Sequence, residues 1–326
     1  MNRYCIGYDI GGTKCAVLLG AQDASGGITI ADKIRFETKA ARGWQAVAAE
    51  LLDTTRAILA KNALAASDIA AAGVSCGGPL NSRTGTIHCP PNLPDWDGVP
   101  ICAMLREAFG FPCALQNDAN ACALAEWRFG AGRGMDSLIF LTFGTGMGAG
   151  LILDGRLYSG ASDMAGEVGH IRLAQTGPVG YGKAGSFEGF CSGGGIARLA
   201  MEMAEQAIRR GEAPSFCASL AELEGITAQT VAKAAAEGDA LAVKIYNLCG
   251  ERLGEGLALL MDILNPEAIV IGSIYARAGD LLEDSMRRAI AREALTYTSE
   301  SCRILKAELG DAIGDYAALG VAMQEI

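Results

Sequence analysis

The stretch "YCIGYDIGGTKC", residues 4–15, lies almost at the start of the chain. Apolar residues lead into Asp9, two glycines, a threonine and a lysine, and apolar residues then resume with "AVLLG". This pattern predicts a strand, a tight turn and a second strand. A Walker A loop needs the spacing GxxxxGK[ST] and a following helix, and the stretch has neither. Glycines in a hairpin turn can still aim successive backbone N–H groups at a phosphate, so we interpret the stretch as a candidate phosphate-binding hairpin.

The same pattern returns at residues 136–155, "DSLIFLTFGTGMGAGLILDG". The glycines resemble the GxGxxG of a dinucleotide-binding fold, but a strand follows them where that fold requires a helix. Two hairpins of similar length, each with a threonine among its glycines, predict an internal repeat of one supersecondary unit. Each half is expected to be a mixed sheet flanked by helices, with the two turns facing each other across a cleft. Ordinary hairpins, whose glycines serve only the turn, are the alternative.

The rest of the chain reads as further strands and helices. Helical spacing of apolar residues predicts helices at 43–64, 100–110 and 119–132, with strands at 69–80 and 112–117. Residues 81–98 are rich in Pro, Asn and Asp and predict a long irregular loop, a kind of segment that often carries function. Beyond residue 193 the chain is predicted to be helical, with the single strand "EAIVIGS" at 267–273.

Composition bounds the class of protein. A chain of 326 residues predicts two domains. The net charge of -10 argues against nucleic acid or anionic lipid as a partner. No apolar run reaches the ~18 residues of a membrane span. The 11 cysteines are odd in number and form no CxxC pair, which favours reduced thiols and a cytoplasmic location.

Four motifs together resemble the ROK family of sugar kinases and sugar-responsive repressors. They are "DIGGTK" (9–14), "NDANACALAE" (117–126), "FGTGMGAGLILDG" (143–155) and "AGEVGHI" (165–171). The resemblance runs nearly end to end. It implies an α/β, actin/hexokinase-like (RNase H-like), duplicated two-lobe fold with a central cleft. The expected lobes are residues 1–118, joined by a C-terminal helix at about 312–326, and residues 119–311.

The resemblance also implies that both glycine turns hold ATP. The expected nucleotide-binding residues are Gly7, Asp9, Gly11, Gly12, Thr13, Lys14, Gly144, Thr145, Gly146, Gly148, Gly150 and Gly272. The carboxylate of Asp9 has the wrong charge for a phosphate and suits a hydrated Mg²⁺, so we expect Asp9 to hold magnesium through water.

Asp118 is the candidate catalytic base. Phosphoryl transfer to a hydroxyl needs positioning, charge neutralisation and one base near the alcohol. Asp118 follows the strand 112–117 and opens a helix, whose dipole favours an ionised carboxylate. An aspartate in this place is also a typical helix N-cap. The resemblance favours the base, because "NDAN" matches the motif that carries the catalytic aspartate.

A buried sugar needs a partner for each hydroxyl, because every unpaired one costs ~1–3 kcal/mol. Carboxylates, an imidazole and amides supply such partners. The sugar-binding residues that the resemblance implies are Gly78, Asn92, Asn117, Asp118, Glu167, His170 and Glu188. For a lone glutamate, a solvated surface charge is the alternative.

The sequence departs from the family in one segment. Most ROK proteins follow the "GH" histidine with a cysteine run that binds a structural Zn²⁺. Here Val179, Tyr181 and Ser186 occupy the three cysteine positions. His170 and Cys191 alone cannot close a tetrahedral site, so we predict no zinc. Tyr181 or a backbone carbonyl is then expected to orient the His170 ring.

These inferences predict an ATP-dependent kinase that acts on a hexose, with the 6-hydroxyl and glucose as first choices. N-acetylglucosamine, N-acetylmannosamine or a β-glucoside is the alternative substrate, and a non-catalytic sugar-binding ROK protein is the alternative function. A repressor is disfavoured, because the chain opens on the first strand with no DNA-binding domain before it. The apolar helices 195–209 and 240–264 favour a homodimer.

Overall fold

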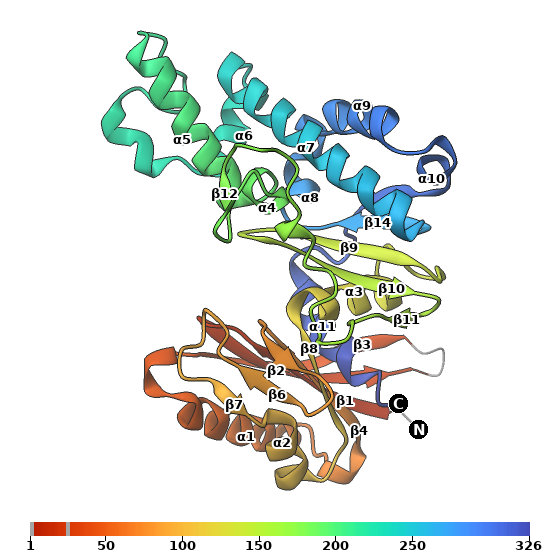
Figure 1. Cartoon of the computed structure of the whole chain (residues 1–326). Helices are drawn as coiled ribbons and strands as arrows, with labels where there is room; N and C mark the ends of the chain where they lie inside the picture. Colours follow the sequence, from red (N-terminus) through yellow and green to blue (C-terminus); the bar gives the residue numbers. More distant parts are fainter. Residues whose placement is uncertain (1–2, 24–26) are drawn as a thin grey trace. The chain divides into compact units, whose positions relative to one another are not determined.

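The computed structural model describes residues 3–23 and 27–326 (Figure 1). The chain forms two compact units. Unit 1 comprises Met1–Met135, Gly150–Ala165 and Glu308–Ile326, and unit 2 comprises Asp136–Ala149 and Gly166–Ala307.

This division differs from the predicted lobes in three segments, because residues 119–135, 150–165 and 308–311 belong to unit 1 and not to the second lobe. We assigned residues from 119 onward to the second lobe, whereas α3 (Asp118–Phe129) packs along α11 (Ile313–Ala322) and belongs to unit 1. The predicted lobe boundaries stay a prediction.

Unit 1 is built on a five-stranded sheet in the order β3-β2-β1-β4-β8. β2 runs antiparallel to β1 and β3, while β4 is parallel to β1 and β8. The bounds are β1 (Arg3–Ile10), β2 (Lys14–Gln22), β3 (Ile28–Glu37), β4 (Ile69–Cys76) and β8 (Cys113–Asn117). The helical segments are η1 (Ala40–Arg42), α1 (Trp44–Lys61), η2 (Ala66–Asp68), α2 (Ile101–Phe109) and η6 (Gly310–Ala312).

Alternate residues of β1 face two different cores. Tyr8 and Ile10 lie in the larger core, with apolar residues of α1 and α2, whereas Cys5 packs in the smaller core, with residues of α11. A Cβ atom on Gly7 would lie 3.0 Å from the Cβ of Ala318 in α11. Gly7 therefore lets this helix lie directly on the sheet.

The second sheet has the order β11-β10-β9-β14-β15. Its strands are β9 (Leu138–Phe143), β10 (Met147–Leu153), β11 (Arg156–Leu157), β14 (Ala268–Ile271) and β15 (Arg303–Lys306), and the division between the units falls inside β10. β14 is parallel to both β9 and β15, as β4 is to β1 and β8. The two sheets thus match strand for strand, which confirms the duplication predicted from the two glycine turns.

Helices make up most of unit 2. They are η3 (Val168–His170), α4 (Phe187–Phe190), α5 (Gly193–Arg209), η4 (Leu220–Gly225), α6 (Ala228–Ala236), α7 (Ala240–Leu264), α8 (Ile274–Ala278), η5 (Gly279–Leu281), α9 (Glu283–Glu293) and α10 (Thr296–Ser301). A short hairpin joins β12 (Val179–Gly180) to β13 (Lys183–Ala184).

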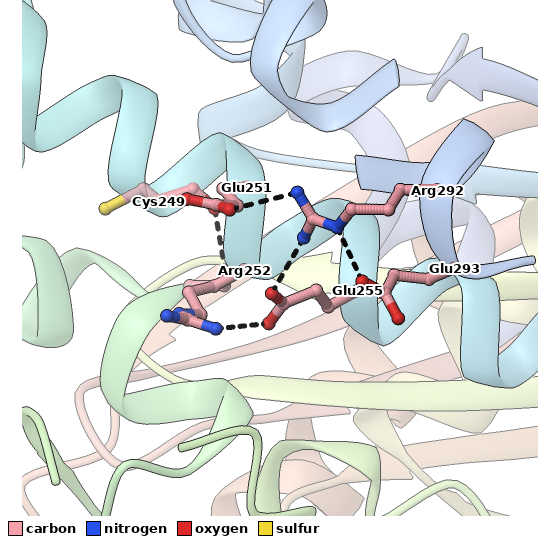
Figure 2. Close-up of polar contacts among 7 residues, drawn as sticks. Cys249, Glu251, Arg252, Glu255, Arg292 and Glu293 are labelled. Atoms are coloured by element: carbon pink, nitrogen blue, oxygen red, sulfur yellow. Dashed lines mark hydrogen bonds and ion pairs between the residues drawn. The ribbon is translucent and has the colours of Figure 1, made fainter. Parts of the chain in front are cut away.

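The long helix α7 packs closely against α9. A Cβ on Gly254 would lie 2.3 Å from the carbonyl oxygen of Met286. Arg292 of α9 also forms ion pairs with Glu251 and Glu255 of α7 (Figure 2). Gly254 permits the close approach of the two helices, and the ion pairs lie along the more exposed side of the helix–helix contact.

Two sequence predictions are wrong in detail. Residues 81–98 are not wholly irregular, because β5 (Leu80–Asn81), β6 (Thr86–His88) and β7 (Asp97–Val99) form a small three-stranded sheet. β15 is a second strand in the segment predicted to hold only one. Strands of two to four residues are too short to show an alternating pattern. Within the described residues, no helix has the length and apolar character needed to cross a membrane.

Candidate functional site

Two predicted acidic residues meet at one edge of the unit 1 sheet. Asp9 pairs with Ser75 of β4, and Gln116 of β8 pairs with the same serine. Asp118 directly follows β8, two residues after Gln116. Because β1, β4 and β8 are parallel, their carboxyl ends lie along one edge. The structure therefore brings Asp9 and Asp118 together, with Gly78 in the segment that follows β4.

The surroundings of Asp9 disfavour its charge. The pKa of Asp9 is raised to about 6. Burial is the largest cause, and the nearby carboxylates of Asp315 and Asp118 act in the same direction. Lys33 and Arg35 act in the opposite direction, but both are ion-paired with Asp315. Asp9 is thus a half-buried carboxylate that forms no ion pair of its own among the described residues, and a bound cation would stabilise its charge.

Asp118 is the first residue of α3 and not its cap. Asn117 is the N-cap, since its Oδ1 atom accepts the N–H of Asn120 at 2.7 Å. Oδ1 of Asp118 accepts the N–H of Ala119 at 2.9 Å. The Asp118 side chain is exposed, yet desolvation by the surrounding protein raises its pKa. The capping role that we weighed for Asp118 therefore belongs to its neighbour, and Asp118 is available to accept a proton.

The first glycine turn is closed by a backbone hydrogen bond and held in place by Thr38. The N–H of Gly11 donates to the carbonyl of Lys14 at 3.1 Å. Thr38, fully buried after β3, donates its hydroxyl to the Gly11 carbonyl at 2.6 Å and its N–H to the Thr13 carbonyl at 2.9 Å. The side chains of Thr13 and Lys14 are exposed. The turn is thus fixed on its inner side, and its outer side carries the exposed side chains of Thr13 and Lys14.

The loop that carries Asn92 lies on this turn. A Cβ on Gly12 would lie only 2.4 Å from the carbonyl oxygen of Asn92. Asn92 itself is exposed. Unit 1 therefore gathers Asp9, the 11–14 turn, Asn92 and Asp118, whereas Gly7 lies back in the sheet and contacts α11.

The second glycine turn is also closed by a backbone hydrogen bond and anchored by another segment. The N–H of Gly144 donates to the carbonyl of Gly146 at 3.1 Å. The Gly144 carbonyl accepts the N–H of Gly193, the first residue of α5, at 2.7 Å. Thr145, at the tip, is exposed. A helix N-terminus and a glycine turn thus lie against each other, a combination that suits an anion.

The remaining glycines predicted to bind the nucleotide have distinct places. Gly148 follows the turn and donates its N–H to the Thr142 hydroxyl at 2.9 Å. Gly272 follows β14 and donates its N–H to the Leu141 carbonyl at 3.0 Å. A Cβ on Gly150 would meet the Ala119 carbonyl at 2.5 Å, so Gly150 is a packing position between β10 and α3.

Glu188 lies against the second turn. Its Oε2 atom accepts the N–H of Met147 at 3.0 Å. A Cβ on Gly146 would lie 2.8 Å from the same oxygen. The short helix α4 holds Glu188 there, and Ser186 caps this helix by accepting the N–H of Gly189 at 3.1 Å.

Glu167 and His170 flank the turn of helix η3 in the same unit, and both are exposed. A Cβ on Gly169 would lie 3.2 Å from the Cβ of Glu188, so η3 passes beside the glutamate. The ring of Tyr181 stands edge-on to the His170 ring, with centroids 6.4 Å apart. The structure therefore places η3, with Glu167 and His170 at its two ends, beside Glu188 in unit 2 and supplies an aromatic neighbour for the histidine.

The segment that replaces the zinc-binding cysteines is held by hydrogen bonds. Ser186 is fully buried, while Val179 and Tyr181 are exposed. Lys183 Nζ donates to the His170 carbonyl at 2.7 Å, and Arg172 donates to the Ala184 carbonyl at 2.6 Å. Among residues 3–23 and 27–326, no group of three His, Cys, Asp or Glu side chains could hold a metal. The absence of zinc itself stays a prediction.

Unit 2 also contains a cavity that no motif in the sequence predicted. Its volume is about 500 Å³. Ile274 lines it, and Ile274 also lies 3.4 Å from the position that a Cβ on Gly193 would take, so the cavity begins next to the second turn. Its apolar lining includes Ala228, Ala232, Tyr246, Ile274 and Leu281, and its polar lining includes Gln229, Lys233, Arg277 and Asp280.

Sequence reasoning missed two residues that support the unit 1 site. Thr38 donates two hydrogen bonds to the first turn, and the carboxylate of Asp315 helps to raise the pKa of Asp9. Both come from elements remote from the turn in sequence. Asp315 lies in "GDYAALGVA", a stretch that carries part of the family resemblance, so that motif could have pointed to it. No comparable signal marks Thr38.

Known proteins resemble this chain along nearly its whole length. The sequence pattern of the ROK family matches residues 5–325. The glucokinase of Streptomyces coelicolor is 30% identical over 98% of this chain and 97% of that protein. The glucokinase of Halalkalibacterium halodurans is 31% identical over 96% of this chain and 93% of that protein.

A solved structure gives the same result for the fold. The ROK family glucokinase from Streptomyces griseus, solved in complex with glucose and AMPPNP, is 30% identical, with a TM-score of 0.72 over 98% of this chain and 99% of that one. This likeness confirms the predicted actin/hexokinase-like α/β fold.

Proposed function

This chain belongs to the ROK family, and we propose that it is a sugar kinase that transfers the γ-phosphoryl group of ATP to a hexose. Glucose is the first choice of substrate and its 6-hydroxyl the first choice of acceptor. Glucokinases that are 30% and 31% identical over nearly the whole chain support the proposal.

The observation that carries the proposal is the placement of Asp118. It lies at the carboxyl end of β8, beside Asp9, and its neighbour Asn117 takes over the capping of α3. Desolvation raises the pKa of Asp118, which makes it a stronger base than an ordinary aspartate. In the proposed reaction, Asp118 accepts the proton of the sugar hydroxyl as the hydroxyl oxygen bonds to phosphorus and the bond to ADP breaks.

The glycine turns are proposed to hold the phosphates of ATP through backbone N–H groups. The cavity between α6 and α8 begins beside the second turn, and about 500 Å³ with an apolar lining suits the adenosine half. Asp9 would hold Mg²⁺ through water, because its desolvated carboxylate gains from a nearby cation. Bound magnesium supplies positive charge against the phosphate oxygens.

The predicted sugar ligands keep their roles as part of the proposal. Glu167, His170 and Glu188 offer carboxylates and an imidazole to sugar hydroxyls. Gly78, Asn92 and Asn117 offer backbone and amide groups. A homodimer and a cytoplasmic location are further parts of the proposal, and both rest on the sequence.

A panel of sugars tests the proposal. Purified protein with ATP and Mg²⁺ is incubated with glucose, N-acetylglucosamine, N-acetylmannosamine and a β-glucoside, and sugar-dependent ADP release is measured. Turnover with glucose at the highest kcat/KM is the expected result. A preference for another sugar corrects the substrate only. Sugar binding without ADP release from any sugar would replace the kinase with a non-catalytic sugar-binding protein.

A further inference from the structure

Glu188 connects two parts of unit 2 that were predicted to bind different ligands. On one side, its Oε2 atom accepts the N–H of Met147 at 3.0 Å, at the end of the glycine turn. The same oxygen lies 2.8 Å from the position that a Cβ on Gly146 would take. A negative charge therefore stands directly against the turn proposed to hold phosphate.

On its other side, Glu188 lies beside η3, which carries the predicted sugar ligand His170, and beside the segment that carries Tyr181. A Cβ on Gly169, next to His170, would lie 3.2 Å from the Glu188 Cβ, and a Cβ on Gly180 would lie 2.9 Å from it. Both glycines let their segments approach the glutamate. In the described part of the chain, Oε1 of Glu188 takes part in no hydrogen bond or ion pair, so it is free to accept one from a ligand.

This position has an electrostatic consequence for the turn. A carboxylate that accepts a turn amide competes with a phosphate for that N–H group, and it also repels the phosphate charge. A hydroxyl that donates to the carboxylate weakens both effects, because it draws the carboxylate charge toward a new donor. The two ligands are then linked through one side chain.

Resting on the proposed function, we propose that Glu188 is a positioning residue that couples sugar binding to nucleotide binding. Without sugar, its carboxylate occupies the Met147 N–H and lowers the affinity of the turn for phosphate. With sugar, hydroxyl donors engage the carboxylate and the turn binds phosphate more tightly. Sugar and nucleotide thus raise each other's affinity, as linkage requires of any such coupling.

The test measures the dissociation constant of AMPPNP with Mg²⁺ by calorimetry, with and without saturating glucose. In the wild-type protein, glucose should tighten AMPPNP binding about tenfold, a typical size for coupling between two sites. In Glu188→Gln, AMPPNP should bind several-fold more tightly than to wild type in the absence of glucose, and glucose should add less than about twofold. Glu224→Gln, which makes the same charge change at an exposed position of η4, should match the wild type.

The affinity for AMPPNP without glucose distinguishes a coupling role of Glu188 from a purely structural role in which its side chain only holds the turn in place. If Glu188 only braced the turn, Glu188→Gln would bind AMPPNP more weakly than the wild type, and that result overturns the proposal. An unchanged coupling factor overturns it as well. Should Glu188→Gln fail to fold by circular dichroism, Glu188→Asp replaces it. That variant is too short to keep the Met147 contact, and it should give a smaller gain in the same direction.

Failure of the coupling role of Glu188 can be told apart from failure of the proposed kinase function. If the sugar panel shows no phosphorylation, the kinase assignment fails whatever the variants do. If the panel succeeds and glucose-free AMPPNP binding does not tighten in Glu188→Gln, the kinase assignment stands and the coupling role of Glu188 fails.

Discussion

Asp9 and Asp118 stand at the carboxyl ends of β1 and β8, the two strands that flank β4. Their surroundings raise the pKa of each carboxyl, chiefly through desolvation. Two such groups close together disfavour each other's charge unless a cation lies near. This arrangement costs stability in the free protein and is suited to a site that receives a cation and a proton.

Asp118→Asn should lower kcat by about 10²- to 10⁴-fold, the usual contribution of a general base. The amide keeps the shape of the side chain but cannot accept the proton. KM for sugar should change less than kcat, because the amide of the variant keeps one acceptor oxygen and can still hydrogen-bond the sugar. Asp53→Asn, at an exposed position of α1 paired with Arg56, is the matched control. Near-wild-type turnover in Asp118→Asn would remove Asp118 as the base.

Asp9→Asn should make the free protein more stable at neutral pH. The pKa of Asp9 is about 6 in the folded protein against 3.8 unfolded, so the folded state binds more protons between these values. Its stability therefore falls as pH rises from about 4 to about 6. At 1.36 kcal/mol per pH unit, the gap amounts to roughly 3 kcal/mol at most.

Urea unfolding without nucleotide or Mg²⁺ checks this expectation. The variant should exceed the wild type at pH 7 and match it near pH 4. Equal stability at both pH values would mean that Asp9 is not desolvated as the structure indicates. The same variant should lose kinase activity, since it also loses the charge proposed to hold Mg²⁺.

Gly12→Ala should weaken nucleotide binding and lower stability by about 1–3 kcal/mol, the usual cost of overpacking. Its new methyl would lie 2.4 Å from the Asn92 carbonyl, a backbone atom, so the turn or the loop must move. Gly225→Ala is the control, because nothing lies within 4 Å of its added methyl. AMPPNP calorimetry and urea unfolding measure both effects, and wild-type affinity in Gly12→Ala would argue against contact between this turn and the nucleotide.

The contact between α7 and α9 should depend on shape more than on charge. Gly254→Ala places a methyl 2.3 Å from the Met286 carbonyl and should destabilise by about 1–3 kcal/mol, partly offset by the better helix propensity of alanine. Arg292→Ala removes the ion pairs of Arg292 with Glu251, Glu255 and Glu293 (Figure 2) and leaves the pair between Arg252 and Glu255. Because the Arg292 side chain is half exposed, the urea midpoint should stay near that of the wild type. A larger loss of stability in Arg292→Ala than in Gly254→Ala would show that the ion pairs hold these helices together.

Chelation should leave the protein intact. Metal analysis is expected to find no zinc, and EDTA should not shift the unfolding temperature. Ser186→Ala should cost about 1 kcal/mol or slightly more, because it removes the buried cap of α4. A stoichiometric zinc ion, or a large loss of stability on chelation, would contradict the hydrogen-bonded account of this segment.

Local patterns in the sequence predicted the long elements and the duplication. The two glycine turns are visible because a run of glycines between apolar strands constrains the backbone over a few neighbouring residues. The motif around Asp118 is visible for the same reason. Short strands such as β15 were missed, since four residues carry too little periodicity.

The sequence by itself determined the two hairpins, the helix that follows β8 and the identity of the acidic residues, because each depends on residues adjacent along the chain. Only the tertiary structure decided that Asn117 and not Asp118 caps α3, that Thr38 anchors the first turn and that Glu188 lies against the second. Those relationships join segments as much as 41 residues apart, and their hydrogen bonds form only when the sheets and helices have packed.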